Sequence, residues 1–594
     1  MGESVIPRSF EGQQKLRHQS PVTSAAWHGL AWLVVANLIG VWLAILLLVP
    51  SAGGWLGELT YGRWMPVHLN FQLYGWLSLP LVAWLLKVYR ADVPPIAAWS
   101  RAALTVWSLA LILGAASWLS GHSSGKLFLD WTGYTRVYFP LAIFLLWLVL
   151  LCAFLRSWRS HTEALRLRLA KLAGLAILLL VPFAIYAAAN PAIYPPVNPD
   201  SGGPTGASQL ESVLVIVLIL FVLPYGLGER KLAGKQWIRA SWIVFAIEAL
   251  LCLGLGRADV SHHRPTQFFS LGSLLIWVPL IPAYYNGFAW ESRTRPWRIA
   301  VLFWWALLIP TGWCLFLPGI LDHLKFTDGL VSHSLLAMAG FVTSLLLLVL
   351  IVLLGKDGDV FDSQWAFVAW NAGTLVYVII MLYAGWIEGY DPAFTMVPST
   401  TRTVIYTLRL LCGFAMFAAS ANWLLSLSRR MRLRQHTVTE RTGPRAHGRW
   451  RDFGGKPDMS KRLLKLYQLL AGLSDTSTGV LLIFAPAWTL HLMGVSAPPL
   501  PIAFASFVGA FVLSVGLSYF LVPASHPLSA NGRASWKAQW QVTALVRSSV
   551  ALVLLSEIAL GRMEPVWITV AITDGLLAAI QWLGLSRGWL SHAE

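Results

Sequence analysis

The chain has 594 residues, of which 57% are hydrophobic and only 12% are charged. A soluble globular protein could not bury so much apolar surface, so the composition excludes that class. The formal net charge of +17 at pH 7 would suit a nucleic-acid partner, but the basic residues cluster in alternate loops. That pattern marks membrane topology and excludes nucleic-acid binding. We therefore expect an all-α polytopic membrane protein.

The first predicted domain covers 26–427 and follows a polar, basic segment, 1–25, that has no cleavage-site pattern. Its apolar segments are about 20 residues long, enough to cross about 30 Å of hydrocarbon as helices. We expect twelve transmembrane helices in this domain, near 26–50, 67–86, 101–121, 137–155, 168–189, 208–228, 237–255, 266–289, 299–320, 330–354, 364–385 and 402–426.

Basic residues divide the loops of this domain into two sets. The loops after the second, fourth, sixth and eighth helices are rich in Lys and Arg, as between Arg156 and Lys171, whereas the loops between them carry few. Positively charged loops stay on the cytoplasmic side of a membrane. We therefore place the basic loops and both termini in the cytoplasm, as for a protein of the bacterial inner membrane.

A basic linker and a second domain follow. The linker is predicted over 428–462, where arginines such as Arg429 and Arg451 suit a solvated tether beside anionic lipid. The second domain, 463–594, is expected to be a four-helix transmembrane bundle, with helices near 464–487, 502–522, 540–558 and 566–585. Its sequence indicates no chemistry, and we expect His491 and His526 in its loops.

Two histidines are expected at similar membrane depth in the first domain. His68 lies near the outer end of the second helix, and His333 lies near the outer end of the tenth. Two neutral imidazoles that face each other across a bundle are a common way to hold a haem b. The alternative for either residue is a helix-end histidine bonded to a backbone carbonyl or to water.

Several short segments of the first domain are similar to those of one family: Arg63 to His68, Gly125 to Trp131, His323 to Asp328, Leu336 to Gly340 and Tyr406 to Gly413. The domain resembles subunit I of the haem-copper oxidase superfamily, nearest to the C-family cytochrome oxidases and the nitric oxide reductases. The resemblance implies the twelve-helix fold, a low-spin haem ligated by His68, and respiratory partners such as a cytochrome c. No CxxCH motif is present, so a c-type haem must come from another subunit.

The family's ligand set is incomplete in this sequence. Active members carry His-x-His on the tenth helix, where this chain has His333-Ser334-Leu335. In one register, His333 takes the high-spin haem position and Leu335 replaces the low-spin ligand. In a slipped register, His333 pairs with His68 on a single low-spin haem. Both registers stay open.

The copper ligands of the family are also missing. The resemblance puts Ala207 at the ligand position of the sixth helix and Gly254-Leu255 at the copper pair of the seventh. His262-His263 follows in an outer loop, where we expect a loop or helix-cap role. We therefore expect at most one haem b, no copper and no assigned catalytic residue.

Two acids are candidates for a proton path, because an ionisable group at membrane depth is costly. Glu248 lies within the seventh helix, and Glu211 near the start of the sixth resembles a glutamate that nitric oxide reductases keep. The alternative for each is a protonated acid bonded to a neighbouring helix. Arg409, in the twelfth helix, is expected either to meet a haem propionate or to extend outward to the membrane surface.

Three functions follow from these residues. The first is a haem b-binding electron-transfer or scaffold subunit of a respiratory complex that has lost its copper centre. The second is an active oxidoreductase, the catalytic subunit of a terminal oxidase or nitric oxide reductase, with relocated ligands that include His262 and His263. The third is a proton channel or transporter that uses Glu211 and Glu248.

Overall fold

The computed structural model describes residues 20–57, 59–126, 128–159, 164–204, 206, 209–255, 261–441, 459–493, 495, 503–525, 530–559 and 563–586. Over these ranges the regular structure is helical except for one short antiparallel pair, β1 (Glu229–Arg230) and β2 (Phe288–Ala289). Thirteen helices among the described residues are long and apolar enough to cross a membrane. The prediction of an all-α multi-pass membrane protein is confirmed.

The chain divides into two compact units, Met1–Pro444 (unit 1) and Arg445–Glu594 (unit 2). The boundary falls within the segment 428–462 that we predicted as a linker. The structure differs at the start of that segment, where α16 (Thr400–Arg441) continues as one helix of 42 residues. No Gly or Pro occurs between 428 and Gly443 to end the helix. Arg430 is also fixed there, because it donates to the Lys356 carbonyl at 2.5 Å.

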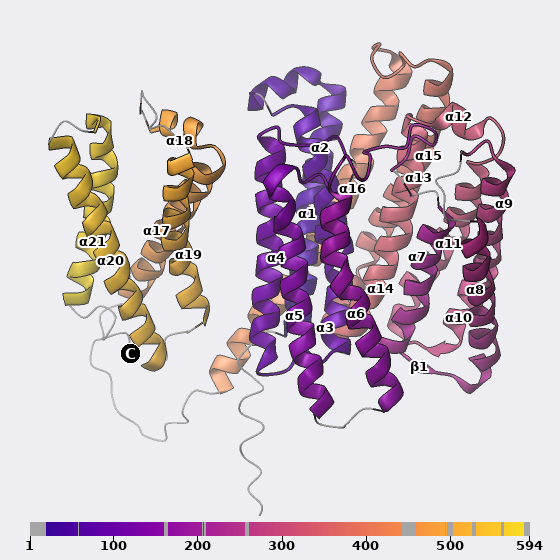
Figure 1. Cartoon of the computed structure of the whole chain (residues 1–594), viewed down its shortest axis with the longest axis horizontal. Helices are drawn as coiled ribbons and strands as arrows, with labels where there is room; N and C mark the ends of the chain where they lie inside the picture. The colour runs from indigo at the N-terminus through magenta and orange to yellow at the C-terminus, as the bar shows by residue number, and fades with distance from the viewer. Residues whose placement is uncertain are drawn as a thin grey trace, which may run out of the picture. The chain divides into compact units, whose positions relative to one another are not determined.

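The helices of unit 1 run side by side (Figure 1), and each predicted range overlaps a helical segment. In chain order these are α1 (Pro21–Leu48), α2 (Tyr61–Asn70), α3 (Leu79–Val88), α4 (Ile96–Leu119), α5 (Tyr138–Arg159), α6 (Leu165–Ala188), α7 (Leu210–Val222), α8 (Lys235–Leu255), α9 (Pro265–Ser273), α10 (Trp277–Asn286), α11 (Arg295–Cys314), α12 (Ile320–Leu324), α13 (Asp328–Leu335), α14 (Thr343–Leu354), α15 (Gln364–Tyr390) and α16.

The second and tenth predicted helices are each interrupted by a π-helical segment. The segment η2 (Phe71–Leu77) joins α2 to α3, and η8 (Leu336–Val342) joins α13 to α14. Each segment begins three residues after a candidate haem ligand, His68 or His333. π-helical turns leave the regular hydrogen-bond ladder and are frequent at functional sites.

Side chains satisfy the backbone carbonyls around both π segments in the same way. In each segment, a hydroxyl five residues further along the chain and a tryptophan from a neighbouring helix donate to two successive carbonyls. In η2, Ser78 Oγ donates to Leu73 O at 2.9 Å and Trp107 Nε1 donates to Tyr74 O at 2.7 Å. In η8, Thr343 Oγ1 donates to Met338 O and Trp370 Nε1 donates to Ala339 O, both at 2.9 Å.

The two interrupted helices are also joined to each other. Trp76, at the end of η2, is fully buried and donates from Nε1 to Thr343 Oγ1 at 3.0 Å. This buried bond holds the two segments at one relative height. The positions of His68 and His333 along the membrane normal therefore depend on a direct contact between their own helices.

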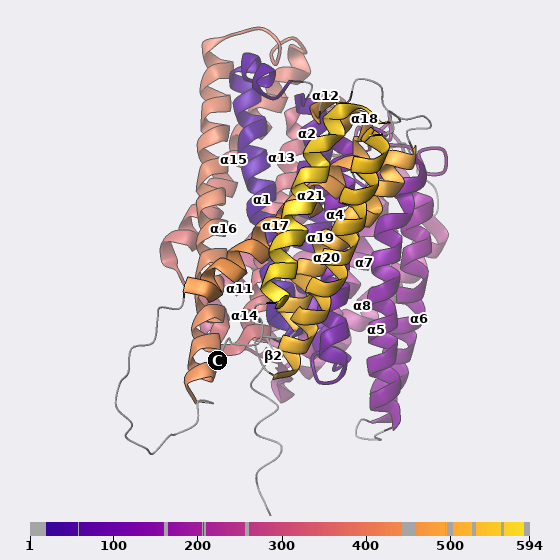
Figure 2. The same ribbon diagram turned by 90° about the vertical axis from the view of Figure 1, so that its left-hand side faces the viewer.

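Unit 2 consists of α17 (Met459–Phe484), α18 (Pro486–Leu492), α19 (Ala503–Ser525), α20 (Ala530–Ala559) and α21 (Ile568–Ser586). Figure 2 shows these helices together. Glycines bring α17 and α19 into close contact, since a Cβ at Gly479 or Gly516 would clash with the backbone of the facing helix. His491, expected in a loop, lies in the seven-residue helix α18. His526 lies outside the described residues.

Candidate functional site

His68 projects from α2 toward α1. Its Nδ1 lies 2.8 Å from the carbonyl oxygen of Ala36. A carbonyl only accepts, so Nδ1 carries the proton and the lone pair of the neutral ring lies on Nε2. The ring packs against Gly40, where an added Cβ would lie 2.7 Å from the imidazole Cε1. The backbone bond that we considered as an alternative to ligation is present, and it also orients Nε2 as a metal ligand is usually oriented.

His333 projects from α13 toward α11. Its ring packs against Gly312, where an added Cβ would lie 3.1 Å from the imidazole Cε1. Ser332, its neighbour in sequence, fixes α13 to α15 by donating to the Val378 carbonyl at 2.7 Å. Within the described part of the chain, the His333 side chain has no hydrogen-bond partner. The ring is half-buried within the helical unit, so its nitrogens are open to a ligand.

The helices that carry His68 and His333, α2 and α13, both lie toward the upper end of unit 1 in Figure 1. The two rings contact different helices, since His68 packs against α1 and His333 against α11. Among the described contacts, no hydrogen bond joins the two rings. Ligation of one haem by both therefore stays a prediction, as does the register of His333.

Arg409 lies beside this region and is directed inward. Its side chain is 11% exposed, and Nη1 lies 3.5 Å from a carboxylate oxygen of Asp328, the first residue of α13. The guanidinium also lies over the ring of Tyr377 at 5.4 Å and interacts electrostatically with His68. Our alternative of an outward-reaching side chain is wrong, because Asp328 holds Arg409 in the interior.

Two acids near Arg409, Asp328 and Glu388, form an arrangement that the sequence did not predict. Glu388 of α15 accepts from the backbone N–H of Asp328 at 2.7 Å, and the second oxygen of Glu388 is buried with no partner among the described residues. The sequence feature that could have indicated these residues is a pair of acids near the ends of the tenth and eleventh predicted helices. Nothing in the sequence alone related these acids to an arginine on the twelfth helix.

The two candidate proton-path acids differ in environment. Glu248 of α8 is 3% exposed and accepts from Trp277 Nε1 on α10 at 2.5 Å, and its other oxygen is buried with no described partner. The bond to Trp277 agrees with the alternative of an acid bonded to a neighbouring helix. Glu211 is exposed in the first turn of α7, where a negative charge is favoured by the helix dipole.

His262, in the loop before α9, connects to the loop that contains Asp200 and to the short helix α12 that contains Asp322. Its ring, 6% exposed, lies between Asp200 at 2.8 Å from Nδ1 and Asp322 at 3.0 Å from Nε2. Candidate ligand atoms of Asp200, His262 and His263 lie within 4.8 Å of one another. The doublet occupies the loop before α9, as expected, and the sequence analysis missed both aspartates. Ala207 lies outside the described residues, so its position is not compared.

The two aspartates of this loop cluster favour the ionised form. Burial raises the pKa of Asp200, but hydrogen bonds from the backbone and ring of His262 and from Ser261 outweigh burial and hold the pKa below its usual value. A hydrogen bond from Lys325, 2.9 Å away, is the main cause that lowers the pKa of Asp322. The cluster therefore joins the loops most strongly when both carboxylates are charged.

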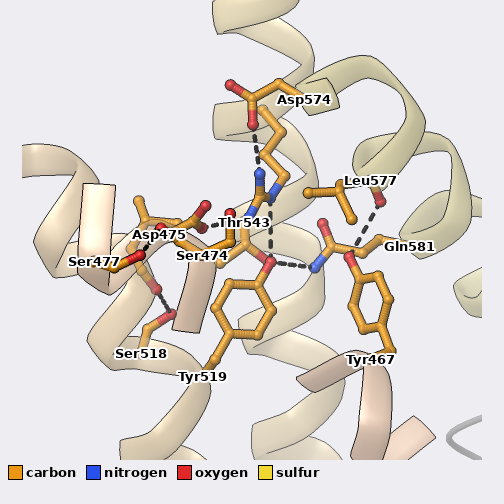
Figure 3. A network of polar contacts seen from close by, with 12 residues as sticks. Tyr467, Ser474, Asp475, Ser477, Ser518, Tyr519, Thr543, Asp574, Leu577 and Gln581 are labelled. Atoms are coloured by element: carbon orange, nitrogen blue, oxygen red, sulfur yellow. Dashed lines mark hydrogen bonds and ion pairs between the residues drawn. The ribbon is translucent and has the colours of Figure 1, made fainter. Parts of the chain in front are cut away.

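Unit 2 contains a polar network where the sequence analysis expected no chemistry. Arg547 of α20 pairs with Asp475 of α17 and Asp574 of α21, and its Nε donates to the hydroxyl of Tyr519 on α19 at 3.3 Å. Figure 3 shows Asp475, Tyr519 and Asp574 directed toward one point. The sequence feature that could have indicated this network is the presence of three charged residues inside apolar helices, since such residues are functional candidates by default.

No protein-family model matches the chain, and no curated protein matches its sequence.

Proposed function

We propose that this protein is a subunit I-like member of the haem-copper oxidase superfamily that binds one haem b, lacks the copper centre and serves a respiratory complex as an electron-transfer or scaffold subunit. Its place is the bacterial inner membrane, with both termini in the cytoplasm and a cytochrome c or similar subunit as partner. One observation carries the proposal: two half-buried imidazoles at one end of the bundle, each against a glycine and each three residues before a π segment.

The chemistry of the two rings fits a haem iron. Neutral imidazole donates to iron through one nitrogen, while the other nitrogen is commonly bonded to a carbonyl. His68 has this arrangement, with Nδ1 on the Ala36 carbonyl at 2.8 Å. The half-buried ring of His333 has no hydrogen bond among the described residues, so a ring nitrogen is available to donate to an iron.

Arg409 supports the same site. A haem carries two propionates, and a guanidinium binds a carboxylate strongly when both are removed from water. Arg409 already holds one carboxylate, that of Asp328 at 3.5 Å, and lies near His68. When haem is bound, Arg409 would pair with a propionate at this position.

The arrangement of the remaining histidines supports the loss of copper. Copper in this family needs several imidazoles from different helices at one point. Among the described residues, one group has candidate ligand atoms within 4.8 Å of one another: Asp200, His262 and His263. Its two imidazoles come from adjacent residues of one loop. Both nitrogens of His262 are also taken up by carboxylates.

The test is a haem and copper count on the full-length protein purified from a haem-producing host, with a reduced-minus-oxidised spectrum. We expect about one b-type haem per chain and no stoichiometric copper. His68→Ala and His333→Ala should each change or abolish the spectrum, and His122→Ala, at an exposed loop histidine, should not. Absence of haem from the wild type would overturn the proposal. Stoichiometric copper would replace it with an active catalytic subunit.

A further inference from the structure

The centre of unit 2 holds a charged cluster to which four helices contribute. Arg547 donates from its two terminal nitrogens to Asp475 on α17 and Asp574 on α21. Tyr519 on α19 accepts from Arg547 Nε at 3.3 Å and from Gln581 Nε2 at 2.9 Å. Figure 3 shows these groups around the guanidinium. The cluster therefore lies between the four helices and not on the surface of one of them.

The cluster lies far from the ends of the apolar spans. Arg547 is eleven residues from either end of the span Trp536–Ile558, and Asp574 is nine and twelve residues from the ends of Pro565–Ser586. At 1.5 Å per residue, eleven helical residues correspond to about 16 Å. That distance is close to half the thickness of the hydrocarbon core, so these charges are at mid-membrane depth.

The charges of the cluster do not balance. Two carboxylates face one guanidinium, and the other described partners, Tyr519, Gln581 and Thr543, are neutral. The side chains of Arg547, Asp475 and Asp574 are only 3%, 13% and 20% exposed. With both carboxylates ionised, the cluster has a formal charge of −1 in an apolar medium, and an unbalanced buried charge is strongly destabilising. Binding one proton removes the imbalance.

We propose that this cluster is a proton-binding site: Asp475 and Asp574 share one exchangeable proton beside the fixed positive charge of Arg547. Binding forms one carboxyl O–H bond with a proton from water, and release returns it to water, so charge and atoms balance. Asp574, the more exposed of the two acids, is the exchange point. The inference does not depend on the haem proposal, because it concerns residues of unit 2 alone.

The neighbouring neutral groups suit this role. The Tyr519 hydroxyl accepts two hydrogen bonds, from Arg547 and Gln581, so its own hydrogen remains to be donated. The Gln581 carbonyl oxygen is buried and has no partner among the described residues. A proton is favoured over a metal cation because, among the described residues, both carboxylates bond to guanidinium nitrogens, and the site has no convergent set of oxygens.

The experiment is a charge series on the full-length protein in lipid nanodiscs. Infrared spectroscopy of the wild type should show the carbonyl band of a protonated aspartic acid, with a shift on transfer to D2O. Asp475→Asn and Asp574→Asn should each lose this band, because one carboxylate then balances Arg547, and should keep the thermal midpoint. The double variant should lower the midpoint strongly, since Arg547 would have no counter-charge. Glu248→Gln in unit 1 is the control, and it should leave the aspartic acid band unchanged.

Three results would overturn the proposal: an identical aspartic acid band in the wild type and both single variants, a band that does not shift in D2O, or a double variant as stable as the wild type. If the single variants do not fold, Arg547→Lys decides the question. It keeps the charge count and changes the hydrogen-bond partner, so the band should persist at a shifted frequency. An unshifted band in that variant would also count against the site.

Discussion

Gly40 and Gly312 leave the room that the two candidate ligand rings occupy. An added Cβ at Gly40 would lie 2.7 Å from Cε1 of His68, and one at Gly312 would lie 3.1 Å from Cε1 of His333. Carbon atoms rarely approach below about 3.5 Å, so both positions favour glycine for steric reasons. The candidate site therefore depends on the absence of side chains at Gly40 and Gly312 as well as on the two histidines.

We predict that Gly40→Ala displaces the His68 ring and breaks its bond to the Ala36 carbonyl. The expected result is a several-fold loss of bound haem with a destabilisation of about 1–3 kcal/mol, the usual cost of overpacking. Haem per chain and thermal unfolding measure the two effects. Gly54→Ala is the matched control, because nothing lies within 4 Å of an added Cβ there. Equal haem content in the two variants would contradict the prediction.

The loop cluster around His262 predicts a pH dependence. The lowered pKa values of Asp200 and Asp322 mean that the folded state favours the charged carboxylates. Their contribution to stability is present above the unfolded-state pKa, about 3.9 for Asp, and is lost as pH falls through the lower folded values. Asp200→Asn should therefore destabilise the protein by about 1 kcal/mol at neutral pH.

The measurement is the thermal midpoint from pH 7 to pH 3 for the wild type and Asp200→Asn. The difference between the two should shrink toward zero at the acid end. Asp391→Asn serves as control, since Asp391 is exposed and its described acceptor role is a local bond to the Ala393 N–H at 3.1 Å. A difference that stays constant with pH would show that ionisation of Asp200 is not involved.

Thr343 links the two π segments, η2 and η8. Thr343 has two roles there, since its hydroxyl donates to Met338 O at 2.9 Å and accepts from Trp76 Nε1 at 3.0 Å. Thr343 is 1% exposed, so water cannot replace either partner. One hydroxyl therefore stabilises the π segment of the tenth helix and joins it to the second helix.

We predict that Thr343→Val destabilises unit 1 by about 2–4 kcal/mol, because two buried polar groups lose their partners at nearly constant volume. It should also reduce haem binding if the two helices set the relative height of the ligands. Unfolding in mild denaturant and the haem spectrum test both effects. Thr407→Val is the control, because Thr407 is exposed and donates only to Thr403 O one turn earlier. Similar effects of the two substitutions would contradict this account.

The helices were predictable because apolar segments of membrane-crossing length are a local property of the chain. The π segments were not, since an extra residue in a turn requires side chains such as Trp107 and Trp370 from other helices to satisfy the freed carbonyls. The extension of α16 through Arg430 was also missed. Basic residues suggested a tether, but they are good helix formers and lie in a stretch without Gly or Pro.

The two units of the chain have separate polar centres. His68, His333 and Arg409 belong to unit 1, and Asp475, Arg547 and Asp574 belong to unit 2. We predict that cleavage at a protease site inserted between Pro444 and Arg445 leaves the haem spectrum unchanged. Spectra recorded before and after cleavage test this, with the uncut inserted protein as control. Loss of the spectrum on cleavage would show that unit 2 takes part in holding the cofactor.

Hydropathy and residue spacing were enough to predict the membrane class, the approximate positions of the helices and the location of His68 and His333 near helix ends. These properties depend on hydropathy and spacing, which are local. Three features became visible only in the folded chain: Arg409 turns inward to Asp328, His262 lies between Asp200 and Asp322, and Arg547 faces two carboxylates. Charge pairing between helices depends on which faces meet, and that is a result of packing across the whole unit.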